Sequence, residues 1–355
     1  LPFSWLYGAL LRLRRRLFRC GIRKSYTATV PVISVGNLCL GGSGKTPHTE
    51  YLIRLLLPYY KIATLSRGYK RKTKGAWLAS QLPQSNADTL GDEPFLYHYK
   101  YDNCLVAVSE RRQAGIELLQ KHYPNLQAIL LDDAYQHLSV KRDINILLTE
   151  YAYPWFQDFV LPAGRLREPR SAAKDADIVI VTKCSPSLSE EEAHLFAQKL
   201  KLLPHQQLFF TAFQYKDMYP FSEKARSTTL TPETPLLALT GIAHPQSFLC
   251  HLAQHYSQIR SMAFPDHHRF TPADLQRITE AATTIPNTAI ITTEKDAMRL
   301  LLPEAKKVVS LLSVFILPIE VKFLFEKETH FNRLIYGFIE KNWRECTFSR
   351  RTKSR

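Results

Sequence analysis

The residues best suited to chemistry lie in a glycine-rich loop near the N-terminus. Residues 36–47 read Gly-Asn-Leu-Cys-Leu-Gly-Gly-Ser-Gly-Lys-Thr-Pro and directly follow the apolar run 30–35. A short β-branched run that leads into glycines and closes on Gly-Lys-Thr is typical of a phosphate-binding loop, whose backbone N–H groups point at an anion. We therefore expect Lys45 to reach the β- and γ-phosphates of a nucleotide and Thr46 to take Mg²⁺.

The loop departs from the usual pattern at one position. The first glycine of that pattern lies six residues before the lysine, where this chain has Cys39. Gly41 and Gly42 supply backbone freedom instead, and with Ser43 and Gly44 they complete the predicted nucleotide-binding loop. The alternative is a glycine-rich turn with an unrelated lysine. The strand before the loop and the helical pattern after it favour nucleotide binding.

A second candidate segment is an apolar run that ends in two carboxylates. Residues 129–133 read Ile-Leu-Leu-Asp-Asp, as a Walker-B strand does. A carboxylate at that place holds Mg²⁺ directly or through water. Asp132 and Asp133 also fit a plain turn, but the phosphate-binding loop upstream favours the metal site. Gln136 and His137 follow closely, so we expect them at the same ligand-binding edge of the sheet.

The motif Gly-Asp-Glu-Pro at 91–94 has two interpretations. An Asp before Glu-Pro is a natural helix N-cap. Alternatively, Asp92 is a base that accepts the proton of an attacking hydroxyl. The residues alone favour the cap, because Asp so commonly caps helices. At the start of a later helix, Thr293 and Asp296 form a predicted capping pair as well.

Two further polar segments carry side chains suited to phosphate or proton chemistry. The sequence Phe-Pro-Asp-His-His at 264–268 fits a metal site, a histidine tuned for proton transfer, or a loop-to-helix junction with surface histidines. Residues 161–169 form an irregular turn that contains Arg165 and Arg167. Arginine suits bidentate phosphate binding, and the alternative is a solvated loop.

These segments must be brought together by strands and helices. Short apolar runs alternate with helical patterns at 30–35, 61–65, 106–108, 128–131, 144–149 and 178–182. Such alternation predicts an α/β fold with a doubly wound, mostly parallel sheet and ligands at the carboxyl ends of its strands. We divide the chain into a basic helix (1–24), a phosphate-loop domain (25–212), a linker (213–234), a smaller α/β domain (235–342) that includes a strand at 307–317 and a helix at 329–342, and a disordered basic tail (343–355).

Composition restricts the class of protein. The chain has 355 residues, which suits two domains or one large one, and its 45% hydrophobic residues are ordinary for a globular protein with a full core. Its formal net charge of +15 indicates a phosphate-bearing partner: nucleic acid, an anionic membrane surface or a phosphorylated substrate. The six cysteines are scattered without a Cys-x-x-Cys pair, which argues against disulfides or a zinc site and suits a reducing cytosol.

The N-terminal segment 1–24 is basic and contains no acidic residue. It is not a secretory signal, because its apolar residues precede the charges, and it is too short to cross a bilayer. Its aromatic and leucine residues beside arginines fit an amphipathic helix in a membrane interface, or alternatively a helix packed on the protein with solvated arginines. The unbalanced charge favours the membrane. The basic residues are Arg12, Arg14, Arg15, Arg16, Arg19, Arg23 and Lys24.

Taken together, the motifs resemble the tetraacyldisaccharide 4′-kinase family of lipid A biosynthesis. They occur in the family's order over nearly the whole chain, whereas few other families would share more than the phosphate loop. The matching segments are Val-Gly-Asn-Leu-x-x-Gly-Gly-Ser-Gly-Lys-Thr-Pro (35–47), Leu-Ser-Arg-Gly-Tyr (65–69), Gly-Asp-Glu-Pro (91–94), Leu-Asp-Asp-Ala-Tyr-Gln-His (131–137), Leu-Pro-Ala-Gly-Arg-Leu-Arg-Glu-Pro (161–169), Phe-Pro-Asp-His-His (264–268) and Thr-Thr-Glu-Lys-Asp (292–296).

The resemblance implies a kinase that uses ATP and Mg²⁺ to phosphorylate the 4′-hydroxyl of a lipid A disaccharide 1-phosphate. The active site is expected in a cleft between two α/β domains, at the cytoplasmic face of the bacterial inner membrane. In the family the acid of Gly-Asp-Glu-Pro is the base and the first His after Phe-Pro-Asp assists it. These positions are Asp92 and His267, which reverses the preference for a cap.

The resemblance also assigns the remaining site residues. Lys45 and Thr46 bind ATP and Mg²⁺, and Asp132 and Asp133 serve the metal. Cys39 and Tyr135 are tolerated variation, and Leu138-Ser139 replaces a more basic stretch. Four residues lie in segments expected to bind the nucleotide: Gln136, His137, Arg167 and Glu168. Four residues are expected at the lipid substrate or its 1-phosphate: Asn37, Arg67, Tyr69 and Arg71.

Two other functions remain open from the residues. One is a phosphate-loop GTPase, because Thr182-Lys183 at a strand end faintly resembles a guanine-reading motif, although Ser185 replaces the required Asp. The other is a non-enzymatic adaptor bound to nucleic acid or membrane by charge, but the basic residues form no recognition motif for nucleic acid. We expect a monomeric enzyme whose partners are the lipid precursor and the membrane surface, with no nucleic acid.

Overall fold

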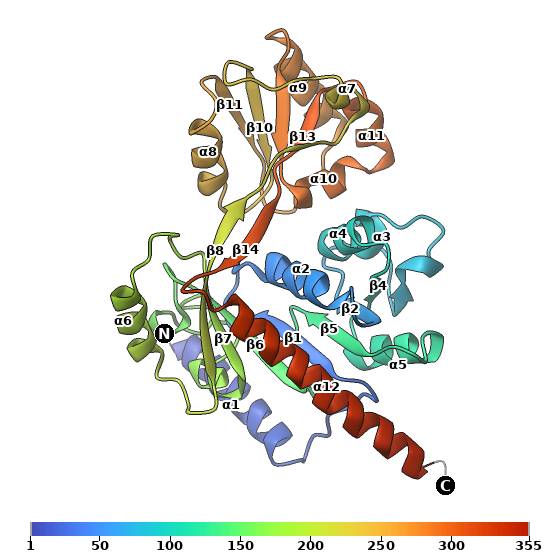
Figure 1. Ribbon diagram of the computed structural model, residues 1–355, viewed down its shortest axis with the longest axis vertical. Helices are drawn as coiled ribbons and strands as arrows, with labels where there is room; N and C mark the ends of the chain where they lie inside the picture. The colour runs from blue at the N-terminus through green and yellow to red at the C-terminus, as the bar shows by residue number, and fades with distance from the viewer. Residues whose placement is uncertain (1, 354–355) are drawn as a thin grey trace.

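The computed structural model describes the backbone of residues 2–353 and the side chains of residues 2–342. The chain forms two α/β domains (Figure 1). The large domain comprises residues 2–215 and 319–353, and the small domain comprises residues 216–318. Residues 1, 354 and 355 lie outside the described part, as do the side chains of residues 343–353. The side chains of the predicted basic tail (343–355) therefore lie outside it as well.

A nine-stranded sheet forms the centre of the large domain, in the order β14-β8-β7-β6-β1-β5-β2-β4-β3. Its strands are β1 (Val32–Asn37), β2 (Ile62–Ser66), β3 (Trp77–Leu78), β4 (Leu105–Val108), β5 (Ala128–Asp132), β6 (Ile144–Glu150), β7 (Ile178–Thr182), β8 (Gln207–Tyr215) and β14 (Ile319–Phe323). Its helices are α1 (Pro2–Arg19), α2 (Lys45–Leu56), α3 (Ala87–Leu90), α4 (Asp92–Lys100), α5 (Arg112–His122), α6 (Glu190–Leu200) and α12 (Glu328–Lys353).

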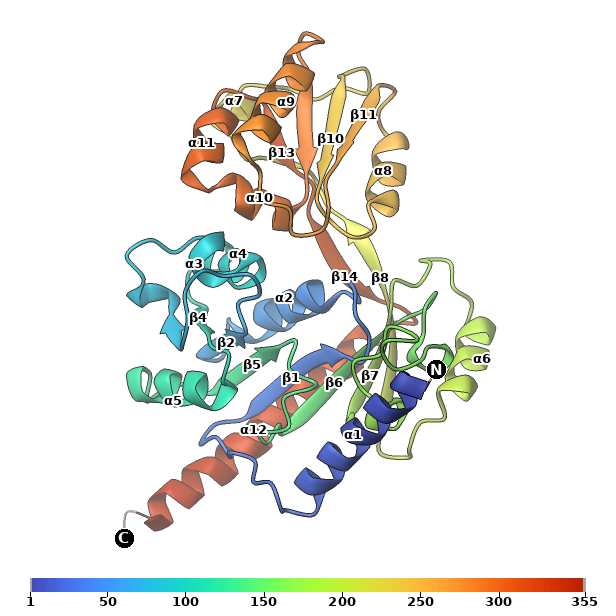
Figure 2. The same ribbon diagram turned by 180° about the vertical axis from the view of Figure 1, so that it is seen from behind.

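The sheet is parallel except at its two edges, where β3 and β14 run antiparallel to their neighbours. Strands β1, β5 and β7 are buried along their whole length, because helices cover both faces of the sheet. Helix α12 crosses one face and α1 lies on the other (Figures 1 and 2). The predicted fold class, a doubly wound sheet with a second, smaller α/β domain, is confirmed.

The small domain contains a five-stranded sheet in the order β11-β10-β12-β13-β9. Its strands are β9 (Tyr219–Pro220), β10 (Leu236–Thr240), β11 (Ile259–Ala263), β12 (Ala289–Thr292) and β13 (Val314–Ile316). Its helices are α7 (Glu223–Arg226), α8 (Gln246–Ala253), α9 (Pro272–Thr283), α10 (Glu294–Leu300) and α11 (Pro303–Val309).

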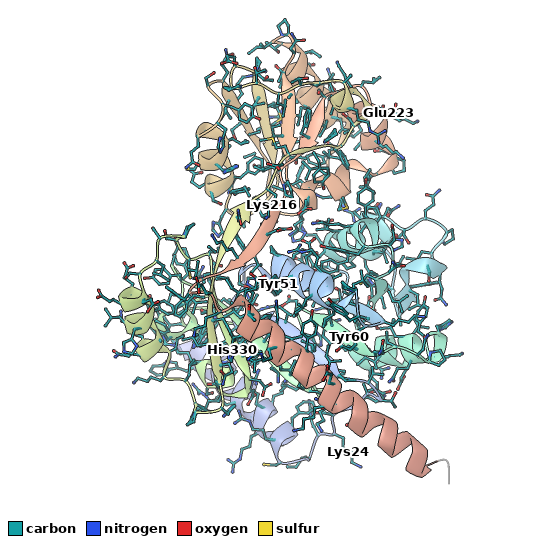
Figure 3. The ribbon with its side chains drawn as sticks, in the orientation of Figure 1. Lys24, Tyr51, Tyr60, Lys216, Glu223 and His330 are labelled. Atoms are coloured by element: carbon teal, nitrogen blue, oxygen red, sulfur yellow. The ribbon has the colours of Figure 1, made fainter. Side chains whose placement is uncertain are left out.

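The predicted linker at 213–234 is corrected by the structure. Its first residues continue β8, β9 pairs with β13, and α7 packs in the small domain. The connection between the domains consists instead of two antiparallel strands, β8 and β14, which meet at Lys216 and Pro318. Figure 3 labels Lys216 at this narrow junction. The polar composition of the segment reflects short edge elements and not a flexible tether.

The predicted end of the small domain at residue 342 is also wrong, because the chain returns to the large domain at β14. The buried face of α12 carries Phe331 and Ile335, which join the core of the large domain. The hydroxyl of Tyr51 on α2 donates to Asn332 at 2.7 Å, and Figure 3 shows Tyr51 near α12. The predicted helix was correct in type, but sequence order alone placed it in the wrong domain.

The predicted strand at 307–317 is partly a helix. Residues Pro303–Val309 form α11, which begins with a proline in its first turn, and only Val314–Ile316 form a strand. The β-branched residues near Val308 suggested a strand, but Val309 packs on the core of the small domain as part of a helix face. Among the described residues, no helix is long and apolar enough to cross a bilayer.

Candidate active site

The phosphate-binding loop connects the central strand β1 to α2. The strand ends at Asn37 and the helix begins at Lys45, so the loop lies at the carboxyl edge of the parallel sheet. Gly44 is the N-cap of α2 and adopts the left-handed conformation, with φ of 85°. The first turn of α2 therefore directs its unpaired N–H groups and its positive end toward the loop, as a phosphate requires.

Asp132 and Asp133 stand beside this loop, because β5 pairs with β1 and brings Val35 level with Asp132. The Nζ of Lys45 lies 3.7 Å from an oxygen of Asp133, and the Tyr97 hydroxyl donates to Asp132 at 3.0 Å. Burial, with the nearby carboxylates, raises the pKa of Asp132 to about 6. Burial would also raise the pKa of Asp133, but Lys45 and Arg167 outweigh it and hold that pKa below its usual range.

Polar atoms without partners mark the same edge. The Oδ1 of Asp132, the Oγ of Ser43 and the Nδ2 of Asn37 are buried and have no hydrogen-bond partner among the described residues. Leaving buried polar atoms unpaired costs free energy unless a ligand satisfies them. A carboxylate oxygen and hydroxyl groups are the donor set that Mg²⁺ prefers, so Asp132, Ser43 and the nearby Thr46 fit a magnesium-bound nucleotide.

Arg167 joins three of the predicted site residues. Its guanidinium donates to both oxygens of Asp133, at 2.7 and 3.1 Å, and to the side chain of Asn37. Gln136 donates to the backbone carbonyl of Asn37 at 2.8 Å. The turn that contains Arg167 is held against the loop because Arg167 donates its N–H to the carbonyl of Leu38. These residues therefore form one connected group around the loop.

Arg112 is a site residue that sequence reasoning missed. It lies at the start of α5, is 1% exposed, and donates to the backbone carbonyls of Ser109 and Asp132. Burial lowers its pKa to about 10, so it remains a cation beside the two aspartates. Burial and the charge of Arg112 lower the pKa of His137 to about 3, which keeps that ring neutral. An arginine within an ordinary helical pattern gave no signal in the sequence.

Asp92 meets His267 across the boundary between the two domains. The Nδ1 of His267 lies 2.9 Å from Oδ2 of Asp92, and the buried Arg299 donates to the same oxygen at 3.0 Å. The capping interpretation is wrong, because Gly91 is the N-cap of α4 and Asp92 makes no capping bond. Both donors use Oδ2, so within the described residues Oδ1 accepts no hydrogen bond.

Lys295 and Glu93 complete this group and were also missed. The Nζ of Lys295 lies 3.1 Å from Nε2 of His267 and 3.0 Å from Glu93. Burial would raise the pKa of Glu93, but Lys295 and His267 outweigh it and lower that pKa. Because Lys295 donates a hydrogen bond to Nε2, the ring proton of His267 lies on Nδ1, which donates a hydrogen bond to Asp92. The residues of the Thr-Thr-Glu-Lys-Asp segment predicted a helix cap, and Thr293 does cap α10. They did not predict that Lys295 contacts His267.

The loop after β2 forms the wall of a narrow pocket beside Asp92. The ring of Tyr69 meets the ring of His267 edge-on, with centroids 5.3 Å apart. A side-chain carbon on Gly68 would lie 2.6 Å from the carbonyl oxygen of Leu90, and one on Gly91 would lie 3.1 Å from the backbone of Gly68; both residues also have positive φ, which favours glycine. The pocket is lined by Tyr69, Lys70, Ala87, Asp88, Asp92, His267, Arg269, Arg299 and Leu302.

The two arginines predicted to meet the substrate in this loop differ. Arg67 is exposed at the edge of the sheet. The Arg71 side chain is 2% exposed, and its guanidinium donates to Glu110 at 2.6 Å and to the carbonyl of Gly75. Arg71 therefore stabilises the loop through Glu110, Gly75 and Thr73, and its expected contact with the substrate stays a prediction.

Glu168, which lies in a segment expected to bind the nucleotide, is held by two arginines of α1, and its role at the nucleotide stays a prediction. It is fully buried and accepts hydrogen bonds from Arg15 at 2.7 Å and Arg14 at 3.4 Å, both on α1. Asp175 accepts from Arg15 and Arg19. Three of the seven basic residues of the N-terminal segment are therefore paired, with acids more than 150 residues away in the chain, which the composition of the segment alone does not show.

Helix α1 packs on the large domain through a face that consists mainly of small and polar residues. Its buried residues are Ser4, Gly8, Leu11 and Arg15, at helical spacing. The opposite side exposes large apolar side chains to solvent. Their exposed fractions are 75% for Phe3, 73% for Trp5, 62% for Leu6, 39% for Tyr7, 55% for Leu10 and 54% for Leu13.

The residues of two alternative sites, the guanine-reading motif and the Asp-His-His metal site, are paired with other groups in the structure. Lys183 of the faint guanine-reading motif pairs with Glu150 at 3.1 Å, and the Thr182 hydroxyl donates to the loop carbonyl of Ser43. His268 pairs with Asp274 of α9, while His267 pairs with Asp92. The two histidines thus face different carboxylates and do not converge on one metal.

Known proteins resemble this chain over nearly its whole length. The tetraacyldisaccharide-1-P 4′-kinase family, LpxK, matches residues 1–340. The chain is 43% identical over 367 residues to the tetraacyldisaccharide 4′-kinase of Bacteroides thetaiotaomicron, covering 99% of this chain and 95% of the relative. It is 46% identical over 342 residues to the Flavobacterium johnsoniae tetraacyldisaccharide 4′-kinase, covering 96% of each. A crystal structure of LpxK from Aquifex aeolicus in complex with ATP superposes with a TM-score of 0.70 at 29% identity, covering 95% of this chain and 98% of the other.

Proposed function

The chain belongs to the tetraacyldisaccharide-1-P 4′-kinase family, and from this premise we propose how its residues carry out that reaction. The reaction is transfer of the γ-phosphate of ATP to the 4′-hydroxyl of a tetraacyldisaccharide 1-phosphate, a lipid A precursor. One observation carries the assignment of the site: Asp92 and His267, from different domains, lie 2.9 Å apart and line the same pocket.

The loop side of the site binds and neutralises the phosphates. The transition state of phosphoryl transfer spreads negative charge over the γ-phosphate oxygens, and catalysis depends on positioning and charge stabilisation. Lys45 and the N–H groups at the start of α2 supply these interactions. Arg167 and Arg112 hold Asp133 and the end of β5 in place, so the site is organised before ATP binds.

Asp92 serves as the acceptor of the hydroxyl proton. His267 and Arg299 both donate to Oδ2, which leaves Oδ1 to accept a hydrogen bond from the 4′-hydroxyl. His267 is in turn held by Lys295, so the carboxylate has one orientation. An Asp has an ordinary pKa near ~3.9 and is a weak base, which suffices because the proton leaves late in a loose transition state.

Mg²⁺ is the expected cofactor, and Thr46, Asp132 and Asp133 would hold it, with Ser43 close by. When bound, it would neutralise charge on the β- and γ-phosphates. The unpaired Oδ1 of Asp132 supports this assignment. Ionisation of Asp132, whose pKa lies near 6, then makes metal affinity depend on pH.

The apolar face of α1 is proposed to lie in the membrane that contains the lipid substrate. Phe3, Leu6 and Leu10 recur at helical spacing and are more than half exposed, which is costly in water and favourable in a membrane interface. Arg12 and Arg16 beside this face suit anionic headgroups. The family's substrate is a lipid precursor, and the proposal is a peripheral position of the enzyme on the cytoplasmic face of the inner membrane.

The reaction is tested by incubating the protein with γ-labelled ATP and a tetraacyldisaccharide 1-phosphate in detergent. We expect a labelled bisphosphate from the wild type. For Lys45→Ala we expect a rate at least about 100-fold lower, because the cation that contacts the transferred phosphate is removed. Lys199→Ala, on the exposed side of α6, is the matched control and should keep full activity. Transfer by Lys45→Ala at the wild-type rate would remove the loop from the mechanism.

A further inference from the structure

His48 is a buried histidine that the mechanism above does not use. It lies in the first turns of α2, three residues after Lys45, and is 3% exposed. Its Nδ1 is 2.7 Å from the carbonyl oxygen of Gly44, and its Nε2 is 3.1 Å from the hydroxyl of Thr211. A carbonyl oxygen only accepts, so Nδ1 donates to Gly44. In the neutral ring Nε2 then accepts from the Thr211 hydroxyl, which also lies 3.4 Å from the carbonyl oxygen of Val181.

The contact fixes the last peptide group of the phosphate-binding loop. The Gly44 carbonyl also accepts the backbone N–H of His48 at 3.2 Å. Because a peptide group is planar, holding the carbonyl of Gly44 also sets the direction of the N–H of Lys45. The preceding carbonyl, of Ser43, is held by the hydroxyl of Thr182 at 2.9 Å. Two successive peptide groups of the loop are therefore oriented by side chains of the sheet and α2.

The other partner in this arrangement is β8, the strand that joins the two domains (Figure 1). Thr211, Phe213 and Tyr215 alternate along it and therefore share one face. A side-chain carbon on Gly44 would lie 2.7 Å from the ring of Phe213, so this ring rests directly on the glycine. Tyr215 stacks on His251 of α8 in the small domain, with ring centroids 4.3 Å apart.

We propose that His48 is a positioning residue for ATP, which ties the phosphate-binding loop to the strand joining the two domains. It holds the Gly44 carbonyl on one side and the Thr211 hydroxyl on the other, so the loop is kept in its phosphate-binding conformation by β8. The inference rests on the proposed kinase function, but it concerns ATP binding and is measurable without phosphate transfer.

Three substitutions separate the two hydrogen bonds. His48→Phe keeps a ring and removes both bonds, Thr211→Val removes only the hydroxyl, and His48→Asn restores a donor near the position of Nδ1. A neutral hydrogen bond contributes about 0.5–1.5 kcal/mol, so loss of both should raise the KM for ATP about 10-fold. By the same range, Thr211→Val should raise it about 3-fold and His48→Asn should stay within about 3-fold of wild type.

The readouts distinguish positioning from a merely structural role. We expect the KM for the lipid acceptor to change less than about 2-fold while the KM for ATP rises, since the contact touches only the nucleotide loop. The dissociation constant of a fluorescent ATP analogue should rise in parallel, which tests His48 even if the lipid is not phosphorylated. His194→Phe, on the exposed side of α6, is the control histidine.

Two results would overturn the proposal. One is an unchanged KM and dissociation constant for ATP in folded His48→Phe. The other is a variant whose only change is a lower melting temperature, with the constants for ATP and lipid both preserved. Loss of transfer to the disaccharide by the wild type, with ATP binding still dependent on His48, would instead contradict only the proposed acceptor.

Discussion

Asp92 illustrates how one side chain acquires its role from a distant part of the chain. Its backbone belongs to α4 of the large domain, whereas two of the groups that orient it, His267 and Arg299, come from the small domain. A carboxylate at the first turn of a helix would otherwise cap the helix or face water. Here it is 8% exposed and its Oδ2 is fully used, which leaves one oxygen for a substrate hydroxyl.

Asp132 provides a prediction about stability in the absence of ligands. Its pKa is about 6 in the folded protein, above the ordinary value near 3.8, so the folded state binds the proton more tightly than the unfolded state. The charged carboxylate therefore costs stability at pH above 6, by an amount on the order of 1–3 kcal/mol. Asp132→Asn should raise the melting temperature at pH 7.5 while abolishing catalysis, and the gain should shrink as the pH falls through 6.

The neighbouring Asp133 is the internal control for this measurement. Lys45 and Arg167 lower its pKa, so its charge stabilises the fold above the unfolded pKa, and that contribution is lost only as the pH falls through the lower folded value. Asp133→Asn should therefore lower the melting temperature at pH 7.5. Thermal unfolding of both variants without ATP or Mg²⁺ checks the pair. Shifts of the same sign would contradict the electrostatic description of the site.

The limits of sequence reasoning are clear at this scale. Local spacing identified Lys45, Thr46 and the two aspartates, because the loop and the strand end are contiguous in the chain. Arg112 and Lys295 could not be found in this way, since nothing in their helices distinguishes them from solvated residues. Their roles depend on strand pairing and domain contact, which place them beside carboxylates encoded elsewhere.

Helix α1 shows the same point for a whole element. Its sequence predicted an amphipathic helix, but composition could not tell which side packs on the protein. The structure buries Ser4, Gly8, Leu11 and Arg15, with Arg15 paired to Glu168, and exposes Leu6, Leu10 and Leu13. The face with most of the large apolar side chains therefore points away from the protein. Deleting the helix would leave Glu168 buried without its partners, a costly change. Substitutions on the exposed face are therefore the better test of membrane binding.

We predict that Leu6→Ser combined with Leu10→Ser weakens binding to anionic phospholipid vesicles at least about 10-fold. Each buried leucine contributes about 1.5–3 kcal/mol, and both are more than half exposed in water. The melting temperature should be unchanged because these side chains do not pack on the protein. Leu195→Ser on α6, 57% exposed, is the matched control. Equal sedimentation of the double variant and wild type with the vesicles would exclude α1 as the membrane contact.

The elements of the two sheets were largely predictable, and their assignment to domains was not. Apolar runs identified the central strands to within one or two residues. The strand β14 was not predicted, and the helix α12 was grouped with the small domain because it follows that domain in sequence. The packing of α12 against Tyr51 and the rest of the large core depends on the return of the chain to the large domain after Pro318, which no local pattern encodes.

At the scale of the molecule, a buried ion cluster helps to join the domains. Lys100 on α4 pairs with Glu50 of α2 at 2.8 Å and with Glu294 of α10 at 2.5 Å. Burial, with the charge of Glu50, raises the pKa of Glu294. The lysine thus separates two buried carboxylates at the contact between the large and small domains.

Lys100→Met should destabilise the protein by roughly 3 kcal/mol at pH 8, because it leaves two buried carboxylates without a cation. The loss should be smaller at pH 5, where a carboxyl group can take up a proton. Adding Glu294→Gln to Lys100→Met should recover part of the stability. Chemical denaturation of the single and double variants measures this, and a loss independent of pH would contradict the role given to the carboxylates.

Asp92, which His267 orients across the domain boundary, accepts the hydroxyl proton, and this role is measured by the rate of a single turnover. Asp92→Asn keeps the size of the side chain and removes the proton acceptor; Asp102→Asn, exposed just after α4, is the control. We predict a rate at least about 100-fold lower for Asp92→Asn, with the dissociation constant for ATP within about 3-fold of wild type. A wild-type rate of transfer in Asp92→Asn would show that the proton leaves by another route and would contradict this account.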